Sequence, residues 1–80
     1  MKGIDVSLIV NEAIAEVLKI ELKDITDDST LKSLGADSLD VIDIFMYIED
    51  SLEIEIENDA IIAEDSVTKL TAQVKELVEA

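Results

Sequence analysis

Apolar residues recur at intervals of three and four positions in three segments of this 80-residue chain. This spacing places them on one side of an α-helix, so each segment predicts an amphipathic helix that packs on a shared core. We expect Asp5 or Ser7 to cap the first helix. The second covers residues 38–51, and the last follows a cap at Ser66. A chain of this length has room for one core, so residues 1–80 are expected to form a single domain.

A long connection separates the first two helices. Residues 21–34 are rich in Asp, Ser and Thr, whose side chains bond to their own backbone in turns. Apolar residues are spaced along the segment and are expected to anchor it on the core: Leu22, Ile25, Leu31 and Leu34. We therefore predict a pinned loop that ends in one helical turn. A loop of this length without regular structure usually has a function.

The segment after the second helix alternates polar and apolar residues over 52–57, a pattern typical of a β-strand. No partner strand is evident, so we expect an extended connection that turns Ile54 and Ile56 inward. Asn58 or Asp59 then caps a short helix that ends near residue 63. The predicted fold is an all-α four-helix bundle with three longer helices, a short third helix and a long first loop.

Acidic residues outnumber basic ones by 20 to 6, and the formal net charge is −14. Such a charge repels the phosphates of nucleic acids and anionic membrane surfaces, so we expect neither as a partner. The apolar content of 49%, arranged in helical periods, predicts a folded core rather than a disordered acidic chain. No apolar run is long enough for a signal peptide or a membrane-spanning helix, so we expect a cytoplasmic protein.

Residues 35–40 read Gly-Ala-Asp-Ser-Leu-Asp and join the long loop to the second helix. Gly35 suits a left-handed residue that closes a turn, and Asp37 or Ser38 suits the helix N-cap. A helix boundary alone would explain this pattern. The chain has no histidine and no cysteine, however, so Ser38 is the leading candidate for a covalent site. Without a histidine base, its hydroxyl must be activated by another protein.

This hexapeptide, preceded by a leucine and placed at the start of an apolar helix in an acidic chain, resembles the acyl carrier protein family. The resemblance implies that Ser38 carries a 4′-phosphopantetheine arm, which a phosphopantetheinyl transferase (holo-acyl-carrier-protein synthase) transfers from coenzyme A. It also implies a carrier rather than an enzyme, with no catalytic residues and no metal site of its own. Such a carrier shuttles acyl thioesters between enzymes of fatty acid, lipid or related biosynthesis.

In that family, partner enzymes such as acyl-ACP synthetases, ketosynthases and acyltransferases present basic patches. The residues expected to meet them lie along the second helix: Asp37, Leu39, Asp40, Ile42, Asp43, Met46, Glu49 and Asp50. Electrostatic complementarity raises the association rate and sets orientation more than it adds affinity, which suits a monomeric shuttle. Plain solvation of an acidic helix face is the simpler alternative for these carboxylates.

The resemblance further implies that the attached acyl chain folds back between the second and third helices. The candidate lining residues are Phe45, Ile48, Ile56, Ile61 and Ile62. Ordinary core packing is the alternative role for each of them.

The chain departs from many fatty-acid-synthesis carriers after residue 52, because residues 56–58 lack the family's proline and residues 61–63 are more apolar. A specialised lipid carrier, an aminoacyl or peptidyl carrier, and a polyketide carrier therefore stay open. A non-covalent acidic interaction module is the alternative function outside the carrier proteins.

A calcium-binding loop would need a glycine and a glutamate at set positions, and the acids around 24–28 lack both.

Overall fold

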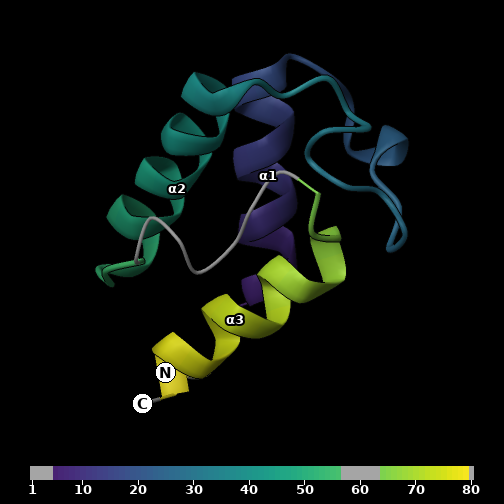
Figure 1. The fold of residues 1–80 in the computed structure, drawn as a ribbon. Coiled ribbons are helices and arrows are strands. Elements are labelled where there is room, and N and C mark those ends of the chain that lie inside the picture. The colour runs from purple at the N-terminus through teal and green to yellow at the C-terminus, as the bar shows by residue number, and fades with distance from the viewer. Residues whose placement is uncertain (1–4, 57–63, 80) are drawn as a thin grey trace.

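The computed structural model describes residues 5–56 and 64–79. This part of the chain forms three α-helices and one short 3-10 helix and contains no strand: α1 (Val6–Leu18), η1 (Leu22–Asp24), α2 (Ser38–Leu52) and α3 (Val67–Glu79). Helix α1 packs against both α2 and α3 (Figure 1). The all-helical class is confirmed. The predicted short helix before residue 64 lies outside the described residues, so three of the four expected helices are seen.

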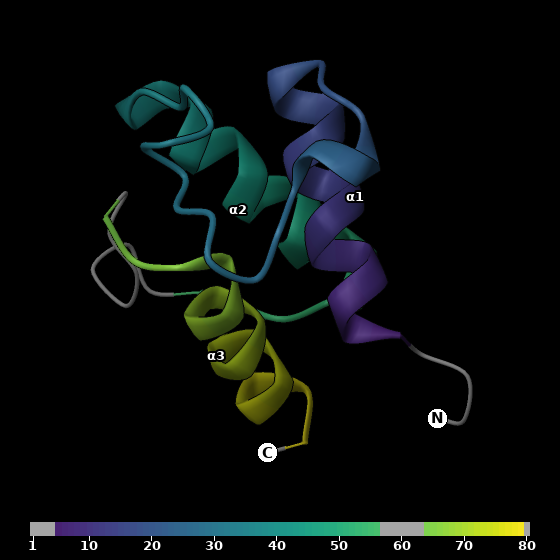
Figure 2. The same cartoon turned by 90° about the vertical axis from the view of Figure 1, so that its right-hand side faces the viewer.

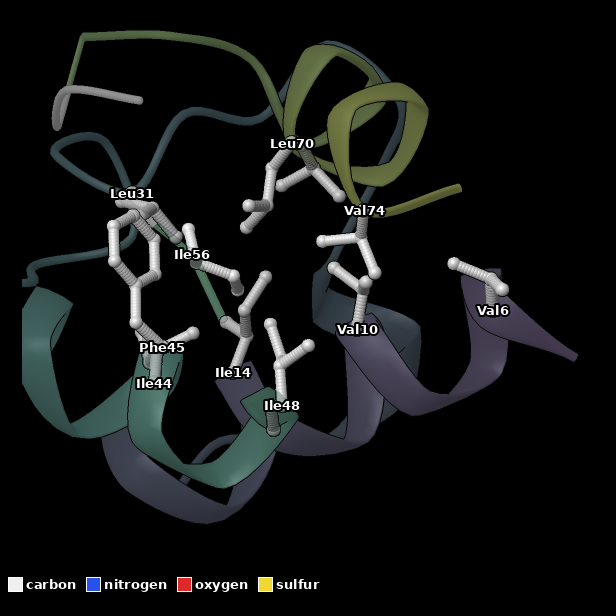
Figure 3. Close-up of a cluster of buried hydrophobic side chains, with 12 residues drawn as sticks. Val6, Val10, Ile14, Leu31, Ile44, Phe45, Ile48, Ile56, Leu70 and Val74 are labelled. Atoms are coloured by element: carbon white, nitrogen blue, oxygen red, sulfur yellow. The ribbon is translucent and has the colours of Figure 1, made fainter. Parts of the chain in front are cut away.

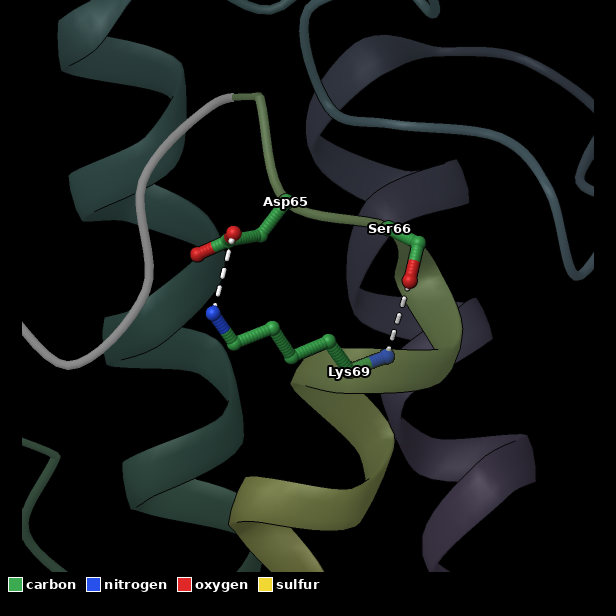
Figure 4. A network of polar contacts seen from close by, with 3 residues as sticks. All are labelled: Asp65, Ser66 and Lys69. Atoms are coloured by element: carbon green, nitrogen blue, oxygen red, sulfur yellow. Dashed lines mark hydrogen bonds and ion pairs between the residues drawn. The ribbon is translucent and has the colours of Figure 1, made fainter.

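The helices begin at the caps that the sequence predicts. Asp5 Oδ1 accepts a hydrogen bond of 3.1 Å from the Leu8 N–H and starts α1. Ser66 Oγ accepts one of 3.1 Å from the Lys69 N–H and starts α3. Beside this cap the Lys69 ammonium pairs with the Asp65 carboxylate at 3.2 Å (Figure 4). Each side-chain cap satisfies a backbone donor that the helix itself leaves free.

The core is aliphatic apart from one phenylalanine, and each of the three α-helices contributes to it (Figure 3). The buried side chains are Val6, Val10, Ala13 and Ile14 of α1, Ile44, Phe45 and Ile48 of α2, Val67, Leu70 and Val74 of α3, and Leu31 and Ile56 of the connections. Within the helices these residues recur at intervals of three and four. The spacing of three and four therefore indicated the buried side of α1 and α3 correctly. In α2 the apolar residues occupy more than one side of the helix, and Leu39, Ile42 and Met46 are exposed.

The loop between α1 and α2 is fastened to the start of α3. Its Ser29 carbonyl accepts a hydrogen bond of 2.7 Å from the Val67 N–H, and its Asp27 carbonyl accepts one of 3.0 Å from Thr68 Oγ1. Leu31 fixes the same stretch from inside the core. Figure 2 shows this loop descending to α3 before it returns to α2. The prediction of a pinned loop is confirmed.

One expected anchor of the loop is wrong. Leu22 is 46% exposed, whereas Ile25 and Leu34 are partly buried against the core as expected. Leu22 opens η1, a turn that was not expected from the sequence, and the Asp24 carboxylate closes that turn by accepting from the Glu21 N–H. A three-residue turn held by its own polar groups does not require its leucine to be buried.

The segment that follows α2 is extended and pairs with no strand in the described residues. Glu53 ends α2 in the left-handed conformation, with φ of 56°. Ile54 is partly buried and Ile56 is buried, as the alternating pattern predicts. Isolated from other strands, this segment is a connection and not part of a sheet.

Candidate functional site

The loop reaches α2 through a glycine in a conformation that other residues rarely adopt. Gly35 has φ of 94°, and its N–H donates to the Lys32 carbonyl at 3.0 Å. The next N–H, of Ala36, donates to the Leu31 carbonyl at 3.0 Å. No atom lies within 4 Å of the position where a Cβ of residue 35 would stand, so the backbone angle and not crowding favours glycine here. The turn ends the loop and directs the chain into α2.

Two aspartates fix the first turn of α2. Asp37 Oδ1 accepts a hydrogen bond of 2.9 Å from the Asp40 N–H, and Asp40 Oδ2 accepts one of 3.2 Å from the Asp37 N–H. This reciprocal pair is a capping box. The sequence left Asp37 and Ser38 as alternative caps, and the structure assigns the cap to Asp37.

Ser38 is the first residue of α2, and its side chain is exposed. Because Asp37 caps the helix, the Ser38 hydroxyl is not needed for that purpose. Within residues 5–56 and 64–79 the Ser38 Oγ has no hydrogen-bond partner. A primary hydroxyl that is exposed and not engaged can become part of a phosphate ester without breaking a contact of the fold.

The electrostatics of this position also fit a phosphodiester. The N-terminus of a helix carries a partial positive charge, and its first N–H groups point at a ligand placed there. The N–H groups of Ser38 and Leu39 bond to no described residue, whereas the Asp40 N–H is used by the cap. The N–H groups of Ser38 and Leu39 can therefore donate hydrogen bonds to a singly charged phosphate linkage. The carboxylates of Asp37 and Asp40 add negative charge beside it.

A row of exposed apolar side chains leads away from Ser38 along α2. Leu39, Ile42 and Met46 are 69%, 48% and 53% exposed. Their spacing of three and four residues places them on one side of the helix. The exposed carboxylates of Asp43 and Asp50 share that side, and neither forms an ion pair with a described lysine. We call these five residues the α2 face.

Two of the acidic residues expected to bind partner enzymes also accept hydrogen bonds within the fold. Asp40 is partly buried and belongs to the capping box. Glu49 is also partly buried, and its Oε2 accepts a hydrogen bond of 2.7 Å from the Ile56 N–H. The Asp-x-x-Asp spacing could have revealed the first contact. No local signal predicts the second, because it spans seven residues and the end of a helix.

The candidate acyl-pocket residues are only partly described. Phe45, Ile48 and Ile56 are buried in the core, where Figure 3 shows Phe45 and Ile56 close to Leu31. Ile61 and Ile62 lie outside the described residues. A hollow of about 310 Å³ lies elsewhere, and its lining contains none of these residues: Ser7, Asn11, Ile25, Thr26, Asp27, Val67, Thr68, Thr71, Ala72 and Lys75. The acyl pocket stays a prediction.

The part of the chain that the structure describes contains ion pairs, but no metal-binding cluster and no helix able to span a membrane. In residues 5–56 and 64–79, no group of three or more acidic side chains is arranged to hold a metal ion. No helix of the same part is long and apolar enough to cross a membrane. The ion pairs of the described residues join Lys23 to Glu21, Lys32 to Glu64 and Lys69 to Asp65, and all of these side chains are exposed except that of Asp65, which is partly buried.

Comparison with known proteins gives a family match over most of the chain. The model of the family described as "Phosphopantetheine attachment site" matches residues 9–74. An acyl carrier protein of Exiguobacterium sibiricum is 53% identical over 51 residues, which cover 62% of this chain and 65% of that protein. One of Clostridium perfringens is 46% identical over 46 residues, covering 56% of this chain and 60% of its own length.

A third relative, an acyl carrier protein of Sulfurovum sp., is 39% identical over 51 residues, covering 62% of this chain and 68% of that protein. This chain therefore spans less than two thirds of the length of the Exiguobacterium sibiricum and Clostridium perfringens proteins. The family model nevertheless includes the loop, the capping box and all of α2. The chain belongs to the acyl carrier protein family, whose prosthetic group is covalently attached 4′-phosphopantetheine.

Proposed function

We propose that this chain is an acyl carrier protein in which the Ser38 Oγ bears the phosphopantetheine arm. The observation that carries the proposal is the exposed Ser38 hydroxyl, which has no bonding partner in the described residues and stands at the start of a helix capped by Asp37. The arm supplies a thiol for thioester formation, a group that this cysteine-free chain lacks. Residues 1–80 then act as one carrier domain.

Loading is a phosphoryl-group transfer onto the serine. The Ser38 Oγ attacks the phosphorus that bears the pantetheine arm in coenzyme A, a new P–O bond forms, and the bond to 3′,5′-ADP breaks. The hydroxyl proton leaves with a base of the transferase, because the chain has no histidine. Asp37 and Asp40 hold the first turn of α2 so that the hydroxyl stays outside the helix end.

The α2 face is the proposed docking surface for the enzymes that load and use the carrier. Its apolar row gives contact area, and Asp43 and Asp50 give a negative field within a chain of formal charge −14. Partners with basic patches, namely a phosphopantetheinyl transferase and acyl-ACP synthetases, ketosynthases or acyltransferases, are steered to it by charge. The relatives named acyl carrier proteins support an acyl cargo, and the pathway that we propose for it is fatty acid, lipid or related biosynthesis.

Intact-mass analysis tests the attachment. The recombinant chain is incubated with coenzyme A, Mg²⁺ and a promiscuous phosphopantetheinyl transferase, and we expect a gain of one phosphopantetheine group. Ser38→Ala should abolish the gain. Ser51→Ala is the matched control, because Ser51 is an exposed serine of the same helix, and it should load normally. Loading of Ser38→Ala, or no loading of the unaltered chain, would overturn the proposal.

A further inference from the structure

The four residues 53–56 leave the C-terminal end of α2, and we call them the strap. Three of their backbone N–H groups donate to a single residue. The Glu53 N–H and, at 3.3 Å, the Ile54 N–H bond to the Glu49 carbonyl, and the Ile56 N–H bonds at 2.7 Å to the Glu49 carboxylate. Glu49 therefore connects the strap to α2 through both its backbone and its side chain.

The last of these bonds sets the position of a core residue. Ile56 is buried, and its side chain lies among those of Leu31, Phe45, Ile14 and Leu70 (Figure 3). Its backbone N–H is held by an ionised acceptor, and hydrogen bonds of this kind are roughly twice as strong as those between neutral groups. The Glu49 carboxylate thus holds the strap where Ile56 can fill the core.

The helical spacing places Glu49 next to residues of the α2 face. Glu49 follows Met46 by three positions and immediately precedes Asp50. No lysine of the described residues forms an ion pair with it. A cationic group that docks beside Met46 and Asp50 would therefore come close to the Glu49 carboxylate, which already accepts a hydrogen bond from the Ile56 N–H. The two donors would compete for it.

We propose that Glu49 is a latch, in which its carboxylate holds the strap on the core while the α2 face is free, and an ammonium or guanidinium group of a docked basic protein draws it away from Ile56. Docking on the surface would in this way loosen the packing of one buried residue. This inference rests on the proposed docking at the α2 face, but it does not depend on modification of Ser38.

Hydrogen exchange of the Ile56 amide, read by NMR, tests the latch in the free protein. Glu49→Ala removes the acceptor and should raise the Ile56 exchange rate about tenfold or more. Glu49→Gln keeps a neutral acceptor and should give an intermediate rate. Asp50→Asn is the matched control, since it removes one charge at the adjacent exposed position, and it should leave Ile56 unchanged. An unchanged rate in Glu49→Ala would refute the latch.

A helical peptide with leucine and arginine on one side serves as the docking probe at low salt. Saturation should raise Ile56 exchange in the unaltered chain. In Glu49→Gln, saturation with the peptide should shift the resonances of the α2 face. The Ile56 exchange rate of this variant should stay the same as without peptide. Saturation without a change at Ile56, or an equal change in Glu49→Gln, would overturn the competition. The Ile56 exchange rate is measured without any group attached to Ser38. A failure of the latch is therefore distinguished from a failure of Ser38 loading.

Discussion

Leu31 and Leu39 lie eight positions apart, and truncating each to alanine should affect different properties of the protein. Leu31 is 1% exposed and anchors the loop in the core, whereas Leu39 is 69% exposed on the α2 face. Removing a buried leucine side chain costs about 2–5 kcal/mol, because transfer energy is lost and a cavity remains. An exposed substitution usually changes stability by less than about 0.5 kcal/mol. The chemical change is the same, so burial alone sets the difference.

The loss at Leu31 is large relative to the whole protein. Domains gain roughly 0.05–0.15 kcal/mol of stability per residue, so 80 residues give about 4–12 kcal/mol. Each kcal/mol lost lowers the Tm of a domain this size by about 4–8 °C. We therefore expect Leu31→Ala to lower the Tm by at least about 8 °C, and Leu39→Ala to change it little.

Urea and thermal unfolding followed by far-UV circular dichroism measure both variants, because the described elements are helical. Leu39→Ala should instead weaken binding to the loading transferase, measured by titration with the folded variant. Equal destabilisation by the two substitutions would refute the assignment of Leu31 to the core and Leu39 to the surface. So would a Leu31→Ala variant as stable as the unaltered chain.

Three further predictions follow from the same structure. Asp37→Ala should lower the free energy of unfolding by about 1 kcal/mol and Asp37→Asn by less, since asparagine also caps; equal effects in urea titration would contradict the capping role. Added NaCl should raise the Tm by screening the charge of −14, by about 4–8 °C for each kcal/mol gained, and a Tm independent of salt would contradict net repulsion. Asp43→Lys should weaken transferase binding at low salt roughly threefold or more without lowering the Tm, and unaltered affinity would argue against steering by the α2 face.

Much of the fold could be predicted because local chemistry determines it. Asp5 and Ser66 are short polar residues placed before apolar periodic segments, and each accepts the backbone bond expected of a cap. Gly35 supplies the positive φ that the turn before α2 needs. The position of Ser38 at the helix start followed from these neighbouring signals, without knowledge of distant contacts.

Other features depend on contacts that the sequence does not announce. Leu22 looks like an anchor by composition, but the hydrogen bond between Asp24 and Glu21 closes η1 and leaves the leucine exposed. The contact of Glu49 with Ile56 depends on how the chain turns after α2, so an acid that reads as surface charge also holds the backbone. Periodicity predicts which side of a helix is buried, but not which polar side chain reaches across its end.

Attachment of the prosthetic group at Ser38 can be located to the residue by peptide mass spectrometry. After loading from coenzyme A, the protein is digested and the peptides spanning the start of α2 are fragmented. We expect one phosphopantetheine group on Ser38 and none on the other serines. A group on Ser33 or Ser51, or full loading of Ser38→Ala, would contradict it.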